Sequence, residues 1–144
     1  MENKENSCVF FASDYHLEMI MLPYINKKFN ENKKIYVFTE NNLEQTINTL
    51  IEKVNLDNNI KSKVLDINWK DEDENKYKKI INDNNAVVFI KGNENYINKT
   101  NKNLNQLKEK NNLEIIDCYN LEEIGNKMPE ILTEHSNIIT TKSE

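Results

Sequence analysis

The sequence contains no arginine, and all nineteen of its basic residues are lysines. Arginine supplies the planar fork that binds carboxylate, phosphate or guanine through two parallel hydrogen bonds, so arginine-finger chemistry is excluded. The 24 acidic residues outnumber the lysines and give a formal net charge of −5. Because non-specific nucleic-acid binding depends on concentrated positive charge, we expect no DNA or RNA partner.

Glycine is also scarce, with only Gly92 and Gly125 among 144 residues. Neither stands in a glycine-rich spacing, which excludes a phosphate loop of the Walker A or the dinucleotide-binding type. A bound nucleotide would therefore need unconventional contacts. Asparagine is abundant instead, in a pattern that AT-rich codon usage explains, so asparagine motifs are poor indicators of a site.

Cysteine and histidine occur only twice each. Cys8 and Cys118 lie in predicted strands, where we expect them to be small buried hydrophobic residues that stay reduced and react slowly. No C-x-x-C or H-x-x-x-H spacing occurs, and a strand separates Cys8 from His16, which argues against a zinc site. No glycines flank Ser13 as in a nucleophile elbow. We therefore predict no metal, no cofactor and no catalytic triad.

Long hydrophobic runs are missing as well. The apolar runs fall far short of the roughly 18 residues that a membrane span needs, and residues 1–7 are polar. We expect neither a signal peptide nor a membrane anchor, and a cytoplasmic location.

The most informative stretch is the apolar run at 8–12, which ends abruptly in Ser13, Asp14, Tyr15 and His16. A short run that is apolar on both alternating faces is typical of a strand covered on both sides in a parallel sheet. The i, i+3, i+4 spacing that follows predicts a helix over about 14–31, capped by Asp14. Pro23 falls inside it, so we expect a kink or a restart near Leu22.

The same alternation of strand and helix continues along the chain. Further strands are predicted at 35–38, 64–67, 86–90 and 113–119, with a short one at 136–140. Further helices follow the first four of them, the last carrying Pro129, and the charged segment 70–79 is predicted to be surface. The pattern predicts an α/β fold, a three-layer α/β/α sandwich with a mostly parallel five- or six-stranded sheet. It forms one domain over 1–144, with 1–6 and 142–144 frayed.

In such sheets ligands bind outside the carboxyl ends of the strands. The rim there carries polar and aromatic residues, among them Glu40 and Asn120. If the strands at 8–12 and 86–90 are the central pair, their turns face each other around a ligand. Lys91 would bind an anionic group, and Trp69 or Tyr119 would offer an apolar wall. The candidate ligand-binding residues are His16, Trp69, Lys91, Glu94 and Tyr119.

His16 attracts interest because its side-chain type changes charge near neutral pH, although a polar residue at the mouth of the sheet is the favoured interpretation. Asp14, His16 and Glu18 cannot converge on one point from a single helix. His135 follows the last predicted helix and could cap its terminal carbonyl groups.

Four short motifs resemble a known family. They are Cys8-Val-Phe-Phe with Leu22-Pro-Tyr-Ile25, then Lys34-Ile-Tyr-Val-Phe-Thr39, then Glu94-Asn-Tyr96, and finally Ile116-Asp-Cys-Tyr-Asn120 with Leu132-Thr-Glu-His135. Together they resemble the MEDS domain, the methanogen and methylotroph sensory domain, a degenerate RecA- or KaiC-like α/β domain without a P-loop. The resemblance implies sensing or signalling by a free-standing domain.

Three functions stay open at this point. The first is a non-enzymatic sensory or regulatory domain in signal transduction, which binds a small-molecule ligand or a signalling partner protein. The second is an enzyme acting on a nucleotide or small phosphate compound, with His16 or Glu40 in acid–base work. The third is a structural interaction module that uses a sheet edge or a helix face. A homo-oligomer is compatible with each.

Overall fold

The protein is built around a parallel β-sheet. The computed structural model describes residues 6–70, 74–81, 85–108, 112–135 and 137–139. The strands are β1 (Ser7–Phe11), β2 (Lys34–Thr39), β3 (Asn85–Lys91), β4 (Asn112–Asn120) and β5 (Asn137–Ile138), in the order β2-β3-β4-β1-β5. Every neighbouring pair is parallel. The predicted α/β class and the parallel sheet are therefore confirmed.

The sheet has fewer full strands than the five or six predicted. Four strands, β1 to β4, have five to nine residues, and β5 adds only two residues at the edge. The stretch at 64–67 was predicted to be a strand, but most of it lies in helix α3 (Asn58–Asp66). Ile60 and Val64 are both buried there, one helical turn apart. Burial of this one face stabilises a helix, which overrides the weak strand preference of a four-residue run.

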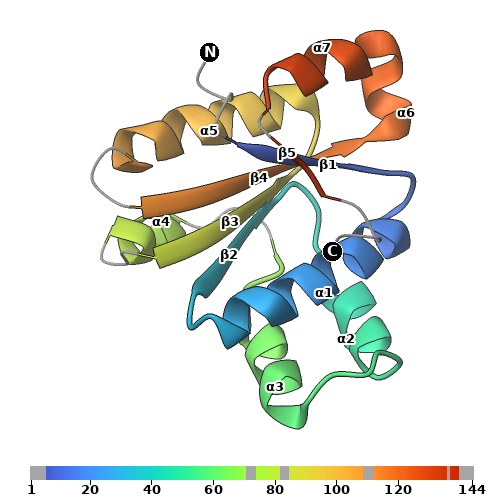
Figure 1. The fold of residues 1–144 in the computed structure, drawn as a ribbon, viewed down its shortest axis with the longest axis vertical. Helices are drawn as coiled ribbons and strands as arrows, with labels where there is room; N and C mark the ends of the chain where they lie inside the picture. The colour runs from blue at the N-terminus through green and yellow to red at the C-terminus, as the bar shows by residue number, and fades with distance from the viewer. Residues whose placement is uncertain (1–5, 71–73, 82–84, 109–111, 136, 140–144) are drawn as a thin grey trace.

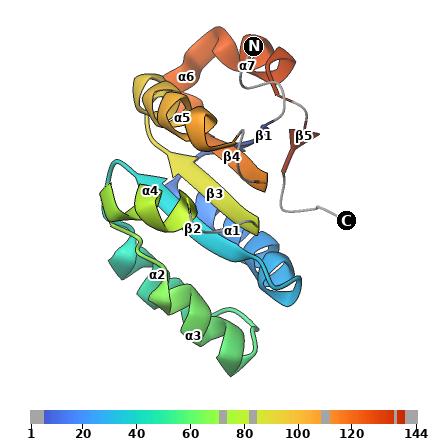
Figure 2. The same ribbon diagram turned by 90° about the vertical axis from the view of Figure 1, so that its left-hand side faces the viewer.

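Helices cover both faces of the sheet, as Figures 1 and 2 show. One face packs against α1 (Asp14–Asn30), α2 (Glu44–Ile51) and α3. The other packs against α4 (Glu74–Ile81), α5 (Glu94–Lys108), α6 (Leu121–Ile124) and α7 (Met128–Thr133). The short 3₁₀ helix η2 (Gly125–Lys127) joins α6 to α7. Among the described helices, none is long and apolar enough to cross a membrane.

The strand sequences explain this double burial. In β1, Val9 and Phe11 face the core under α1, whereas Cys8 and Phe10 face the core under α5 and α7. Successive strand residues point to opposite faces, so a strand with helices on both sides must be apolar throughout. β3 follows the same rule, and six of its seven residues are buried.

Helix α1 begins and continues differently from the prediction. The N-cap is Ser13, not Asp14, because the Ser13 hydroxyl accepts a hydrogen bond from the His16 backbone N–H at 3.2 Å. The helix also runs through Pro23 from Asp14 to Asn30 without a restart. The predicted helix over 14–31 is otherwise confirmed.

Two further predictions need correction. Lys76 on α4 was predicted to lie in a solvated charge run, yet it is only 4% exposed and its ammonium donates to the Val37 carbonyl of β2.

The last predicted helix is divided at Gly125, which has a φ of 57°. This positive φ, with a ψ of −119°, ends α6 in a conformation that glycine adopts readily. Pro129 then lies in the first turn of α7, where a missing N–H costs nothing.

Of the predicted frayed segments 1–6 and 142–144, residues 1–5 and 142–144 lie outside the described residues, as do residues 71–73 of the predicted charge run. The prediction is wrong for Asn6, which is fully buried because its side-chain amide donates to Asn101 and Asp117.

Candidate functional site

The carboxyl ends of β1, β2, β3 and β4 meet around a small pocket of about 330 Å³. This is the edge at which parallel α/β sheets place their ligands. Each of the four strands, or the turn that follows it, contributes to the wall. The lining residues are Phe11, Glu40, Asn41, Lys91, Gly92, Asn120 and Glu123. We call this cavity the carboxyl-edge pocket.

Lys91, the last residue of β3, provides the positive charge of the carboxyl-edge pocket. It is only 8% exposed, and its Nζ donates to the Asn41 side-chain oxygen at 2.8 Å. Its Nζ also lies 5.5 Å from the centroid of the Phe11 ring, within the range of a cation–π interaction. The apolar ring and the amide together hold the ammonium group at the wall of the pocket.

The turn after β2 positions Asn41. The Thr39 hydroxyl donates to the Asn41 carbonyl at 2.7 Å, and the Asn41 N–H lies 3.3 Å from the same hydroxyl oxygen. Thr39 itself is fully buried at the end of β2. A turn that is held by its own side chain presents Asn41 toward Lys91 in one orientation.

The turns after β2 and β3 are tied together through Glu40. Its backbone N–H donates to the Lys91 carbonyl at 3.1 Å, and its carboxylate accepts from the Asn93 N–H at 2.8 Å. The Glu40 side chain lies against Gly92, where an added Cβ would be 2.9 Å from Glu40 Cγ. Gly92 therefore allows a close approach that any larger residue would block.

The end of β4 adds polar groups to the opposite wall. Asn120 caps α6, with its side-chain oxygen accepting from the Glu122 N–H at 2.8 Å. Glu123, in α6, also lines the pocket and is exposed. The carboxyl-edge pocket thus combines one buried ammonium group with amide and carboxylate groups, a set that suits a small ligand with several hydrogen-bonding groups.

The structure does not bring the five predicted site residues together. Only Lys91 lines the carboxyl-edge pocket. Trp69 is 2% exposed in the core beneath α1, and its indole N–H donates to the Val64 carbonyl at 2.8 Å. Tyr119 is 2% exposed in the core on the other face, and burial and the charge of Asp117 raise the pKa of its hydroxyl. These two side chains lie on opposite faces of the sheet.

The other two predicted residues have local partners. His16 is half-buried, and its Nδ1 accepts from the Ala12 backbone N–H at 3.0 Å, at the start of α1. Glu94 begins α5 and pairs with Lys127 at 3.0 Å. The predicted central pair is also altered, since β4 lies between β1 and β3. Of Asp14, Tyr15 and Glu18, only the backbone is described.

Sequence reasoning missed Phe11, Asn41 and Glu123 as pocket residues. Phe11 reads as an ordinary core residue of a strand, and its place at the last position of β1 was the available signal. Asn41 was discounted with the other asparagines, although it stands two residues after β2. Glu40 and Asn120 belonged to the predicted rim and do line the pocket.

A second polar cluster lies inside the sheet, on the face covered by α5 and α7. Asp117 of β4 is fully buried and accepts hydrogen bonds from Asn101 at 2.8 Å and Asn6 at 3.3 Å. His135 Nε2 lies 2.8 Å from the same carboxylate, and His135 Nδ1 lies 2.7 Å from the Ile131 carbonyl. The predicted capping of the last helix by His135 is thus confirmed. Because the side chains of His135 and Asp117 are 1% and 0% exposed, the pair is shielded from any substrate.

The described part of the chain contains no group of three or more histidine, cysteine, aspartate or glutamate residues that could hold a metal ion. Cys8 and Cys118 are buried free thiols, as predicted. Burial raises the pKa of the Cys8 thiol to about 12, with a further contribution from the charge of Asp117. Neither cysteine lines the carboxyl-edge pocket.

Comparison with known protein families, with curated proteins and with solved structures finds no match to this chain. The resemblance to the MEDS domain stays a prediction from the sequence motifs.

Proposed function

We propose that this chain is a non-enzymatic sensory or regulatory domain that binds a small polar ligand in the carboxyl-edge pocket. The observation that carries the proposal is the buried ammonium group of Lys91, held by Asn41 and Phe11 where four parallel strands end. In the three-layer α/β/α arrangement that we infer, this is the usual place for a ligand. The MEDS-like motifs agree with a role in signalling.

The surroundings of the pocket favour binding over catalysis. A general base needs a free acceptor within hydrogen-bonding reach of the substrate. The His16 Nδ1 accepts the Ala12 N–H, so in the neutral ring Nε2 carries the hydrogen and offers no acceptor. One Glu40 carboxylate oxygen accepts the Asn93 N–H, which leaves a single acceptor oxygen on the other acid–base candidate. An ammonium group on an aromatic ring provides charge and shape recognition without a reaction.

A thermal-shift screen against nucleotides and small metabolites tests the proposal. A ligand at about 100 times its Kd should stabilise the native state by about 2.7 kcal/mol and raise the melting temperature. Lys91→Met keeps the apolar stem and removes the charge, and we expect it to abolish the shift from an anionic ligand. Lys102→Met, at an exposed position on α5, is the matched control and should respond as the unchanged protein does.

Two outcomes would contradict the proposal. If Lys91→Met and the unchanged protein show equal shifts with the same ligand, the binding site lies elsewhere. If a nucleotide is turned over and the turnover disappears in His16→Ala, the domain is an enzyme.

A further inference from the structure

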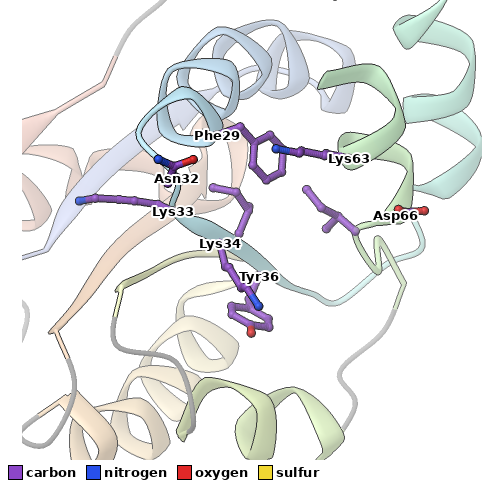
Figure 3. A pocket seen from close by; sticks show the side chains of 9 residues that line it. Phe29, Asn32, Lys33, Lys34, Tyr36, Lys63 and Asp66 are labelled. Atoms are coloured by element: carbon purple, nitrogen blue, oxygen red, sulfur yellow. The ribbon is translucent and has the colours of Figure 1, made fainter. Parts of the chain in front are cut away.

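The edge of the sheet at β2 borders a second cavity. β2 is an edge strand, and a groove of about 520 Å³ runs along its amino-terminal half, at the opposite end from the carboxyl-edge pocket. Figure 3 shows the groove between the end of α1, the start of β2 and α3. Its lining residues are Phe29, Asn32, Lys33, Lys34, Ile35, Tyr36, Lys63, Asp66 and Ile67. We call it the β2-edge groove.

The backbone of β2 offers hydrogen-bonding groups to the β2-edge groove. Val37 accepts a hydrogen bond from the Lys76 ammonium group, so its carbonyl points away from β3 and toward the open edge. In a parallel ladder, alternate residues direct their N–H and C=O groups to the same side, so Ile35 also presents its backbone to this edge. Lys76 covers the edge at Val37, and the part that lines the groove begins before it. A strand edge of this kind is a template for pairing with another chain.

The charges around the β2-edge groove are mostly positive. Lys33, Lys34 and Lys63 line it with a single carboxylate, that of Asp66. In the described part of the chain, none of these three lysines forms an ion pair, although Lys63 Nζ lies 5.6 Å from the Phe29 ring centroid. This excess is local, because the whole protein carries a net charge of −5.

The positive charge of the β2-edge groove favours a negatively charged partner over a second copy of this chain. Two copies of β2 paired with each other would bring their lysines together, and like charges on facing strands are destabilising. A strand that carries carboxylates would instead neutralise the groove and be guided to it. The side chains of β2 alternate, with Ile35 buried in one core and Tyr36 packed against the other. Packing on both faces therefore fixes the position of the β2 backbone at the edge.

We propose that the β2-edge groove binds an acidic peptide in extended conformation, which adds a strand to the open edge of β2. The backbone N–H and C=O groups of Ile35 pair with the peptide main chain, and its carboxylates contact Lys33, Lys34 and Lys63. In this mode main-chain bonds provide affinity and side chains provide selectivity. The proposal does not depend on a ligand in the carboxyl-edge pocket.

Fluorescence anisotropy with a labelled peptide of about eight residues, alternating glutamate and valine, tests the charge requirement. We expect binding that weakens as salt is added, and none by the matched peptide of alternating lysine and valine. Lys34→Glu with Lys63→Glu should weaken binding at least about tenfold. Lys99→Glu with Lys102→Glu, on exposed positions of α5, changes the net charge equally and should keep most of the affinity. An equal loss in both double variants would overturn the proposal, because overall charge would then explain the binding.

A second experiment uses the unchanged protein and tests strand addition directly. Two versions of the acidic peptide are N-methylated at alternating residues, one set in each register, so that all charges remain. Strand addition predicts that one version loses binding and the other keeps it, since only one set of N–H groups faces β2. Equal binding by both versions would contradict strand addition, as would displacement of the peptide by inorganic phosphate at matched ionic strength, which would indicate a small-anion site.

Discussion

His135 and Asp117 form a buried pair whose geometry sets the charge of the histidine. The Ile131 carbonyl can only accept, and so can the Asp117 carboxylate, so both ring nitrogens of His135 carry hydrogen when both bonds form. Burial by itself lowers the pKa of His135, but the hydrogen bonds to Asp117 and Ile131 and the nearby negative charges outweigh it. The pKa therefore lies above its ordinary value of 6.5.

This raised pKa predicts a stability that depends on pH. A histidine with a higher pKa in the folded than in the unfolded state stabilises the protein fully below the unfolded value, about 6.5, and loses this as pH rises through the folded value. Urea unfolding across that range should show the free energy of unfolding falling with pH, and His135→Gln should flatten the slope. An unchanged slope in His135→Gln would show that another group is responsible.

Asp117→Asn should cost roughly 3 to 5 kcal/mol at neutral pH, because it leaves a buried charge without its partner.

Substitution of either glycine should destabilise the protein, but only the change at Gly92 should alter the carboxyl-edge pocket. In Gly92→Ala, the new Cβ would lie 2.5 Å from Tyr96 Cδ2 and 2.9 Å from Glu40, so the turns around the carboxyl-edge pocket must shift. We expect a cost of about 1 to 3 kcal/mol and altered ligand binding. Gly125 has open space around its Cβ position, but its φ of 57° and ψ of −119° form a backbone conformation that L side chains rarely adopt. Gly125→Ala should therefore cost roughly 1 to 3 kcal/mol and leave the pocket unchanged. Denaturant unfolding measures both costs, and equal effects on ligand binding would contradict the assignment.

At the scale of the element, the caps of α1 and α3 provide a matched comparison. Ser13 caps α1 through its hydroxyl, whereas Asp57 stands at the N-cap of α3 without a side-chain hydrogen bond. Ser13→Ala should therefore lower the free energy of unfolding by about 1 kcal/mol, and Asp57→Ala should cost less. Chemical denaturation of the two variants decides this, and a larger loss in Asp57→Ala would show that the cap at Ser13 contributes little.

The two thiols report on the whole molecule. Cys8 faces the core under α5 and α7, and Cys118 faces the core under α1, so a reagent reaches both only when both layers open. We expect slow labelling of the native protein by a thiol reagent, with both cysteines reacting at one rate that rises with denaturant. Rapid reaction of either thiol would contradict the packing of that face.

The sequence by itself determined the α/β class and the strands that are apolar on both faces. Parallel strands covered by helices must be apolar along their whole length, and that requirement can be read in β1 and β3 without coordinates. Helix α1 was also predictable, since its apolar spacing outweighs one proline. The exclusion of a glycine-rich phosphate loop needed only the composition.

Only the tertiary structure decided the strand order and the membership of the site. Placing β4 between β1 and β3 depends on contacts between distant segments, which local periodicity does not encode. Trp69 follows a predicted strand and Tyr119 ends one, the positions that aromatic residues with a polar tip occupy at a ligand site. Their large apolar area is instead buried in the two cores. Lys76 differs from its prediction in the opposite way, since its charged neighbours in the sequence predict an exposed side chain and the fold buries it. The Val37 carbonyl and the Phe38 ring offset the cost of burying its charge.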